Sequence, residues 1–258
     1  MNKGVRMDFF VVVAIIFVSV PLILFFEVRP LVSAIFFFAL PSVYLFFRKK
    51  KPIKELCAGS LLIGVGFGFI FDVLASANNV WNELGSQLVF DYRIFGFLPA
   101  DEPIWFVLWV LFVLVFYEHF YERHRVDRLS KRFLYIFIPV MGMLCATILV
   151  AIFDRERLLF PYAYFLLGLS ALIPVLYVLK SWPHLIPKFV KTSIFFFFLY
   201  LIYELTAVHL GQWYFPGEYI GWVRIEGIEF PLEELLFWMG ASTLVVLSLY
   251  EGLVDDRK

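Results

Sequence analysis

Eight long apolar stretches constrain the fold of this chain more than any other feature. Most of them reach the roughly 17–25 residues that a helix needs to cross a bilayer. With 62% hydrophobic and 17% charged residues, the chain carries more apolar surface than one water-soluble core could bury. We expect an all-α, polytopic membrane bundle of about eight transmembrane helices. The expected spans are residues 8–26, 30–47, 55–77, 104–120, 133–153, 158–179, 191–210 and 235–250.

The basic residues predict the orientation of these spans. Of the 22 Lys and Arg residues, 17 fall in one set of alternate connecting segments, which includes both ends of the chain, and 5 fall in the other. Because Lys and Arg gather in cytoplasmic loops, both termini are expected to be cytoplasmic. The net charge of +0 offers no broad basic surface for nucleic acid, so no nucleic-acid partner is expected.

The chain also repeats itself at an offset of 131–133 positions. Five ordered matches at nearly constant spacing indicate a duplication. An even number of spans per half gives both halves the same orientation, related by an axis along the membrane normal. We therefore predict two four-helix repeats, residues 1–126 and 127–258. The matches are 71–75 with 203–207, Trp81 with Trp213, 93–96 with 224–227, 99–102 with 231–234, and 117–118 with 250–251.

Each half contains a proline, two adjacent acids and an aromatic helix start. The acid pairs are Asp101 and Glu102 in the first half, and Glu233 and Glu234 in the second. Two adjacent carboxyl groups in an apolar site cannot easily both ionise, so one of them keeps a proton. These four residues are the predicted acid/base centre. The structural alternative is that proline and acids merely begin a helix, where they suit its positive dipole end.

Four further charged residues are predicted to support this centre. Asp72 and Glu204 fall within expected spans, where a charge costs at least ~2.5 kcal/mol, so they should face the bundle interior or pair at the interface. Arg93 and Arg224 are the only basic residues of the two long outer loops. Each arginine is expected either to hold one carboxylate ionised or to pin its loop to a helix start by an ion pair.

Aromatic residues make up 21% of the chain, and four of them flank the acids. Trp81, Trp213, Phe106 and Phe237 are candidates for lining a site, where ring faces stabilise a cation by about 0.5–2 kcal/mol each. The alternative for the tryptophans is an aromatic belt at the membrane surface. No two histidines have ligand spacing and no nucleotide-binding motif occurs, so neither a metal nor a cofactor is expected.

In this order, the motifs resemble the membrane-integral lycopene cyclase domain family. That family includes bacterial heterodimeric carotenoid cyclases, their fused two-repeat relatives and the cyclase half of fungal bifunctional enzymes. The resemblance covers residues 30–122 and 161–251 and is best over 211–215 and 231–237. The first copy departs from the pattern: Asp101 replaces the first Glu, Pro103 is extra, and Phe71 stands where Trp is common.

The resemblance implies an intramolecular lyase or isomerase that closes the ψ ends of a lycopene-like carotene to ionone-type rings. The reaction is redox-neutral and needs a proton donor sheltered from water and a base, with no cofactor. A neutral carboxyl would be the acid, and a partner held ionised by Arg93 or Arg224 would balance the cation. The oily substrate would pass laterally between helices from membrane lipid. A prokaryotic cytoplasmic membrane is the expected location, with other carotenoid enzymes or a second copy as candidate partners.

Two rival functions remain open on the sequence. Parallel repeats and intramembrane acids also describe a proton-coupled transporter, in which Asp72 and Glu204 would be relay groups. The altered first copy is also consistent with a non-catalytic protein that needs another subunit.

Overall fold

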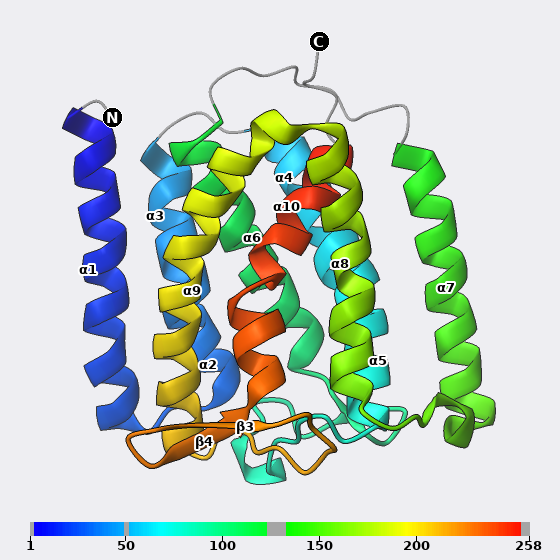
Figure 1. The fold of residues 1–258 in the computed structure, drawn as a ribbon. Helices are drawn as coiled ribbons and strands as arrows, with labels where there is room; N and C mark the ends of the chain where they lie inside the picture. Colours follow the sequence, from blue (N-terminus) through cyan, green and yellow to red (C-terminus); the bar gives the residue numbers. More distant parts are fainter. Residues whose placement is uncertain (1–2, 49–51, 123–132, 254–258) are drawn as a thin grey trace.

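The computed structural model describes residues 3–48, 52–122 and 133–253. Within these residues the fold is an all-α bundle with two small antiparallel hairpins. The long helices run side by side, and both hairpins lie at one end of the bundle, here called the hairpin end (Figure 1). In chain order the elements are α1 (Lys3–Phe26), α2 (Pro30–Ala34), η1 (Ile35–Ala39), α3 (Leu40–Arg48), α4 (Ile53–Gly59), η2 (Ser60–Gly68), α5 (Phe69–Ala77), η3 (Gly85–Gln87), β1 (Arg93–Ile94), β2 (Leu98–Pro99), α6 (Glu102–Phe120), α7 (Phe133–Phe153), η4 (Arg155–Leu158), α8 (Ala163–Ser181), η5 (Pro183–Leu185), α9 (Ile186–His209), β3 (Trp222–Ile225), β4 (Ile228–Pro231), η6 (Glu234–Met239) and α10 (Ser242–Leu253).

Six helical stretches among the described residues are long and apolar enough to cross a membrane, which supports the expected membrane character. They are Lys3–Phe26, Pro30–Arg48, Ile53–Ala77, Glu102–Phe120, Ala163–Ser181 and Pro183–His209. Two more apolar helices, Ile138–Phe153 and Ser242–Leu253, are shorter. The expected count of eight spans therefore stays a prediction.

The helix boundaries differ from the expected spans at three places that shape the hairpin end. Helix α6 begins at Glu102, so this acid lies in the first helical turn. The expected span 158–179 begins as a helix only at Ala163, because Tyr162 takes a left-handed φ of 51°. The expected span 235–250 consists of the π-helical turn η6, which begins at Glu234, followed by α10.

The repeated Arg-Ile-x-Gly motif forms the turn of each hairpin. Phe95 and Gly96 have φ values of 54° and 79°, and Glu226 and Gly227 have φ values of 50° and 82°. Tight hairpin turns need such left-handed residues, and glycine adopts them without steric strain. The repeated glycine is therefore explained by backbone geometry.

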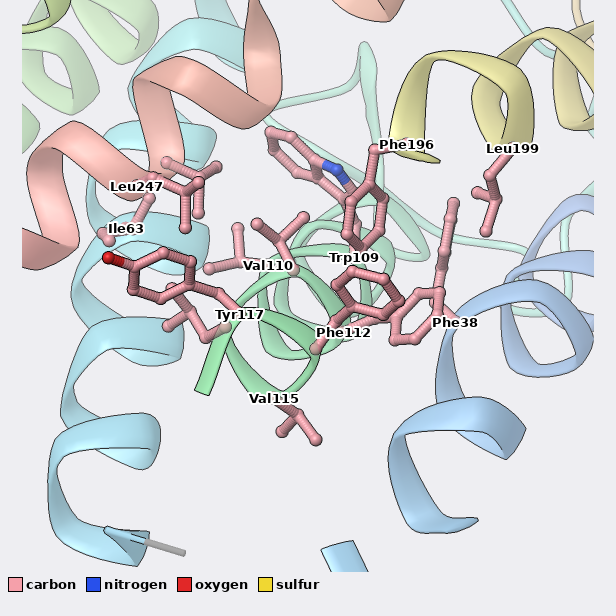
Figure 2. Packing of buried hydrophobic residues seen from close by; sticks show 14 of the residues in the cluster. Phe38, Ile63, Trp109, Val110, Phe112, Val115, Tyr117, Phe196, Leu199 and Leu247 are labelled. Atoms are coloured by element: carbon pink, nitrogen blue, oxygen red, sulfur yellow. The ribbon is translucent and has the colours of Figure 1, made fainter. Parts of the chain in front are cut away.

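Helix α6 forms the centre of the bundle core. Its residues from Phe112 to Tyr117 are completely buried. They meet side chains of η1, η2, α9 and α10, as the labelled residues Phe38, Ile63, Phe196 and Leu247 show (Figure 2). Helix α6 and η2 approach each other closely at Gly64, where a Cβ would lie 3.0 Å from the Val107 Cα. This packing holds α6 in the middle of the bundle, and its first turn carries Glu102.

Residues separated by the repeat offset make reciprocal contacts at both ends of the bundle. At the hairpin end, the backbone N–H of Asn82 donates to the carbonyl of Tyr214, and that of Tyr214 donates to the carbonyl of Asn82, both at 3.0 Å. At the opposite end, the Tyr117 hydroxyl donates to Glu251 at 2.5 Å and the Tyr250 hydroxyl donates to Glu118 at 2.7 Å. An approximate two-fold axis along the bundle would produce such pairs.

Candidate active site

A cavity of about 630 Å³ extends from the hairpin end into the middle of the bundle. Residues of α2, η2, α5, α6, α7, α8, α9, η6 and α10 line it, together with two tryptophans and a glutamate from the loops of the hairpin end. Its wall is mainly aromatic and aliphatic. The aromatic members are Phe67, Phe71, Trp81, Trp105, Phe106, Trp109, Tyr164, Tyr203, Trp213, Phe237 and Trp238. The four predicted aromatic residues are all among them.

Four carboxyl groups line this apolar cavity: Glu83, Glu102, Glu204 and Glu234. Glu83, Glu204 and Glu234 are 6%, 2% and 5% exposed, and Glu102 is half-buried. A carboxyl group taken out of water costs free energy unless it is paired, hydrogen-bonded or protonated. Four of them on one oily surface are therefore a functional candidate rather than a packing solution.

The two acids of each predicted pair have different roles. The Asp101 carboxylate accepts hydrogen bonds from the backbone N–H groups of Val89 at 2.7 Å and Phe90 at 3.0 Å. Glu233 accepts one from the backbone N–H of Ile220 at 2.7 Å. Neither Asp101 nor Glu233 belongs to the cavity wall. The first acid of each pair thus anchors a loop, and only the second acid faces the cavity, which corrects the prediction that all four form one centre.

In the second half, the cavity acids are Glu204 and Glu234. The indole N–H of Trp213 donates to Glu204 at 2.9 Å. The Tyr164 hydroxyl lies within hydrogen-bond reach of the Glu234 carboxyl, and Glu204 and Glu234 lie close enough to interact electrostatically. A phenol and an indole are neutral donors, so this group has no described basic partner. It can therefore hold a proton as well as release one.

In the first half, Glu102 adjoins Glu83, close enough for a hydrogen bond between the two carboxyl groups. Asp72 lies behind them, completely buried and outside the cavity wall. The Ser76 hydroxyl donates to Asp72 at 3.4 Å, and the second Asp72 carboxyl oxygen has no partner among the described residues. The three acids therefore form one group with a single hydroxyl donor.

Glu83 is a cavity residue that the sequence reasoning missed. Its backbone is fixed on one side by the Asn82 pairing with Tyr214, and its own carbonyl accepts from the Arg93 guanidinium at 2.8 Å. Its position in the other half is occupied by Phe215, so the repeat gave no signal for it. The one available signal was an acid two residues after Trp81 in an outer loop. Tyr164 was also missed, because it belongs to none of the repeated motifs.

The two arginines do not hold carboxylates of the acid pairs, contrary to expectation. Arg93 donates to the backbone carbonyls of Phe97 and Glu83, both at 2.8 Å. Arg224 forms an exposed ion pair with Glu229, its cross-strand neighbour in the β3–β4 hairpin. Both arginines therefore shape loops. Among the described residues, neither Arg93 nor Arg224 forms an ion pair with a carboxylate of the acid pairs.

The indole N–H groups of Trp105 and Trp109 donate to tyrosine hydroxyls. Trp105 donates to the Tyr203 hydroxyl at 2.7 Å and Trp109 donates to the Tyr200 hydroxyl at 2.6 Å. Trp238 stacks on Tyr200 with ring centroids 4.3 Å apart. Because these polar atoms are satisfied within the wall, the rings present apolar, electron-rich surface to the cavity.

Tyr219 closes the loop above the site. Its hydroxyl donates to the Val80 carbonyl at 2.6 Å and accepts from the backbone N–H of Gly217 at 2.8 Å. Burial raises the pKa of the Tyr219 hydroxyl above its ordinary value, so it stays a neutral donor. The hydrogen bond from Tyr219 to Val80 therefore joins the outer loops of the two halves.

The fold and the cavity define a class: an apolar helical bundle with an internal hydrophobic cavity that carries buried carboxyl groups. Within the described residues, no group of three His, Cys, Asp or Glu side chains is arranged to hold a metal ion. No protein-family model, curated protein or solved structure matches this chain.

Proposed function

We propose that the protein is a membrane-embedded carotene cyclase that closes ψ end groups of a lycopene-like polyene. One observation supports this most: three buried carboxyl groups and a half-buried one, Glu102, line an aromatic, apolar cavity inside a bundle of helices that could cross a membrane. An oily polyene suits such a wall, and protonation of its terminal C=C needs an acid sheltered from water. The motif resemblance described above points to the same reaction.

The proposed topology has eight spans in two parallel repeats, 1–126 and 127–258. In this arrangement α7 and the combined η6–α10 stretch are the seventh and eighth spans, in addition to the six longer helical stretches. The hairpin end faces outward, since the set of alternate connecting segments that includes Arg29, Arg93, Arg155, Arg157 and Arg224 carries only 5 of the 22 Lys and Arg residues. The reciprocal contacts at Asn82–Tyr214 and at the two Tyr–Glu pairs support this duplication.

In the proposed reaction a cavity carboxylic acid, Glu234 or Glu102, donates its proton to the terminal C=C. The tertiary carbocation that forms is attacked by a C=C further along the polyene, which makes the ring bond and moves the positive charge into the ring. A cavity carboxylate then accepts a ring proton, so the product is an isomer of the substrate and the protein regains its protons. The ring faces of Trp105, Trp213 and Trp238 stabilise the cation.

The two halves supply different partners for these acids. Glu102 adjoins a second carboxyl group, Glu83, whereas Glu234 faces a phenol, Tyr164. Two neighbouring carboxyl groups in an apolar cavity share a proton more readily than both ionise. We therefore assign Glu83 to the site alongside the three cavity acids expected from the sequence.

Expression in a lycopene-accumulating bacterium tests the proposal. The wild-type protein should convert lycopene to a cyclic product of the same mass with a shorter-wavelength spectrum, and Glu234→Gln should abolish the conversion while the protein stays in the membrane. Glu226→Gln is the matched control, since Glu226 is exposed at the tip of the β3–β4 hairpin. Unchanged pigment with wild-type protein would contradict a cyclase and favour the transporter or the two-subunit alternative. Normal cyclisation by Glu234→Gln would remove Glu234 from the site.

A further inference from the structure

The cavity wall includes side chains that are also open to the surroundings of the bundle. Met143 of α7 is 49% exposed and Ile173 of α8 is 67% exposed, yet both line the cavity. Ser170, Ala171 and Pro174 of α8 line it beside them. In a membrane protein, half-exposed apolar residues at mid-helix face lipid. The cavity therefore opens sideways between α7 and α8.

Helix α7 lies at the edge of the bundle (Figure 1) and contacts η2 and α5. Val140 is buried against Gly66 of η2, where a Cβ would lie 3.0 Å from a Val140 methyl carbon. Near its other end, Ala151 belongs to a buried cluster with Val73 and Ala77 of α5. Helix α8 packs instead on α10 and α5, through buried residues such as Val175. Each helix thus has its own support.

The opening is closed at the hairpin end by the linker between the two helices. The Asn78 side chain donates to the carbonyl of Leu158 at 2.8 Å and accepts from the backbone N–H of Phe160 at 2.8 Å. The Arg155 guanidinium lies 4.3 Å from the Phe97 ring centroid and donates to the Ala77 carbonyl at 3.3 Å. The linker is therefore tied to the end of α5, and the gap remains open only along the apolar parts of α7 and α8.

We propose that the gap between α7 and α8 is a portal for the end of a long hydrocarbon chain, with or without methyl branches. The chain end passes through it from the bilayer to the cavity carboxyl groups. An elongated apolar ligand fits because the portal is apolar and the acids lie toward the hairpin end, which the linker closes. The bulk of the chain stays among the lipids while its end group reaches Glu102 and Glu234. The ligand's identity as a carotene rests on the proposed function, but the portal itself does not.

A photo-labelling experiment tests the portal without turnover. The probe is a long-chain hydrocarbon with a terminal diazirine, added to liposomes that hold the full-length protein. In the wild type, adducts are expected on cavity residues near the acids, such as Trp105 and Tyr164. The double variant Met143→Trp with Ala171→Trp fills the gap and should lower this labelling by about tenfold. The matched double variant Leu149→Trp with Leu176→Trp, on exposed residues of the same helices outside the cavity wall, should leave it unchanged.

Cavity labelling that persists in the Met143/Ala171 variant, or that falls equally in the Leu149/Leu176 variant, would overturn the portal. If the Met143/Ala171 variant does not fold, Ile173→Trp against Leu176→Trp repeats the comparison with one substitution on one helix. Carotene conversion is measured in parallel. Labelling that depends on the portal in a protein that converts no carotene would contradict the cyclase and leave the portal standing, so the two failures are distinguishable.

Discussion

Replacing Gly168 with alanine tests the packing that shapes the cavity. A Cβ at Gly168 would lie 2.3 Å from two ring carbons of Phe237, whereas carbon atoms pack about 3.5–4.0 Å apart. The rigid ring must therefore move by about 1.2 Å or more. Overpacking of this kind costs about 1–3 kcal/mol, which lowers Tm by about 2–12 °C at about 2–4 °C per kcal/mol. Because Phe237 lines the cavity, carotene conversion should fall as well.

Thermal unfolding of the purified protein in detergent measures the effect, and Gly142→Ala is the control. Gly142 lies within α7, and a Cβ there would meet nothing within 4 Å. Alanine favours a helix over glycine by about 0.5–1 kcal/mol, so this variant should unfold at the wild-type temperature or slightly higher. A wild-type Tm for Gly168→Ala, or an equal fall for Gly142→Ala, would refute the packing argument.

Three further substitutions follow from the site. Asp101→Ala leaves two backbone N–H groups without their acceptor and should destabilise the protein by about 1–3 kcal/mol, with faster proteolysis of the first outer loop; an intact loop would contradict the anchoring role. Tyr117→Phe and Tyr250→Phe remove the hydrogen bonds to Glu251 and Glu118 and should each lower stability by about 1 kcal/mol in thermal unfolding, and a wild-type Tm for either variant would contradict its contact. Glu83→Gln should lower carotene conversion by about a hundredfold at unchanged Tm, whereas wild-type conversion would exclude Glu83 from the chemistry.

The helical membrane character was predictable because it depends on local hydrophobicity over long windows. The second acid of each pair was also predictable, since a helix start after proline fixes where Glu102 and Glu234 lie. The division of labour within each pair was not. It depends on loop backbone N–H groups that reach Asp101 and Glu233 from 11 to 13 residues away.

The prediction that an arginine holds one carboxylate of each acid pair was wrong, because the hairpins give both arginines other partners. A turn at Glu226 and Gly227 places Arg224 directly opposite Glu229, and cross-strand opposite charges pair. Arg93 has Glu83 close in sequence, but its guanidinium donates to backbone carbonyls that the loop leaves without helical or sheet partners. The first outer loop therefore uses Arg93 as a donor to its own backbone.

Deuterium transfer from solvent tests most directly whether the cavity carboxyl groups protonate a polyene. Purified protein in liposomes is incubated with lycopene in D2O. The pigments are then separated, and their masses are measured by mass spectrometry. The carboxyl protons exchange with solvent, and the ring later loses a different hydrogen. The account therefore predicts a cyclic product that is heavier by one deuterium for each closed ring. Cyclic product without deuterium, or lycopene recovered unchanged, would contradict it.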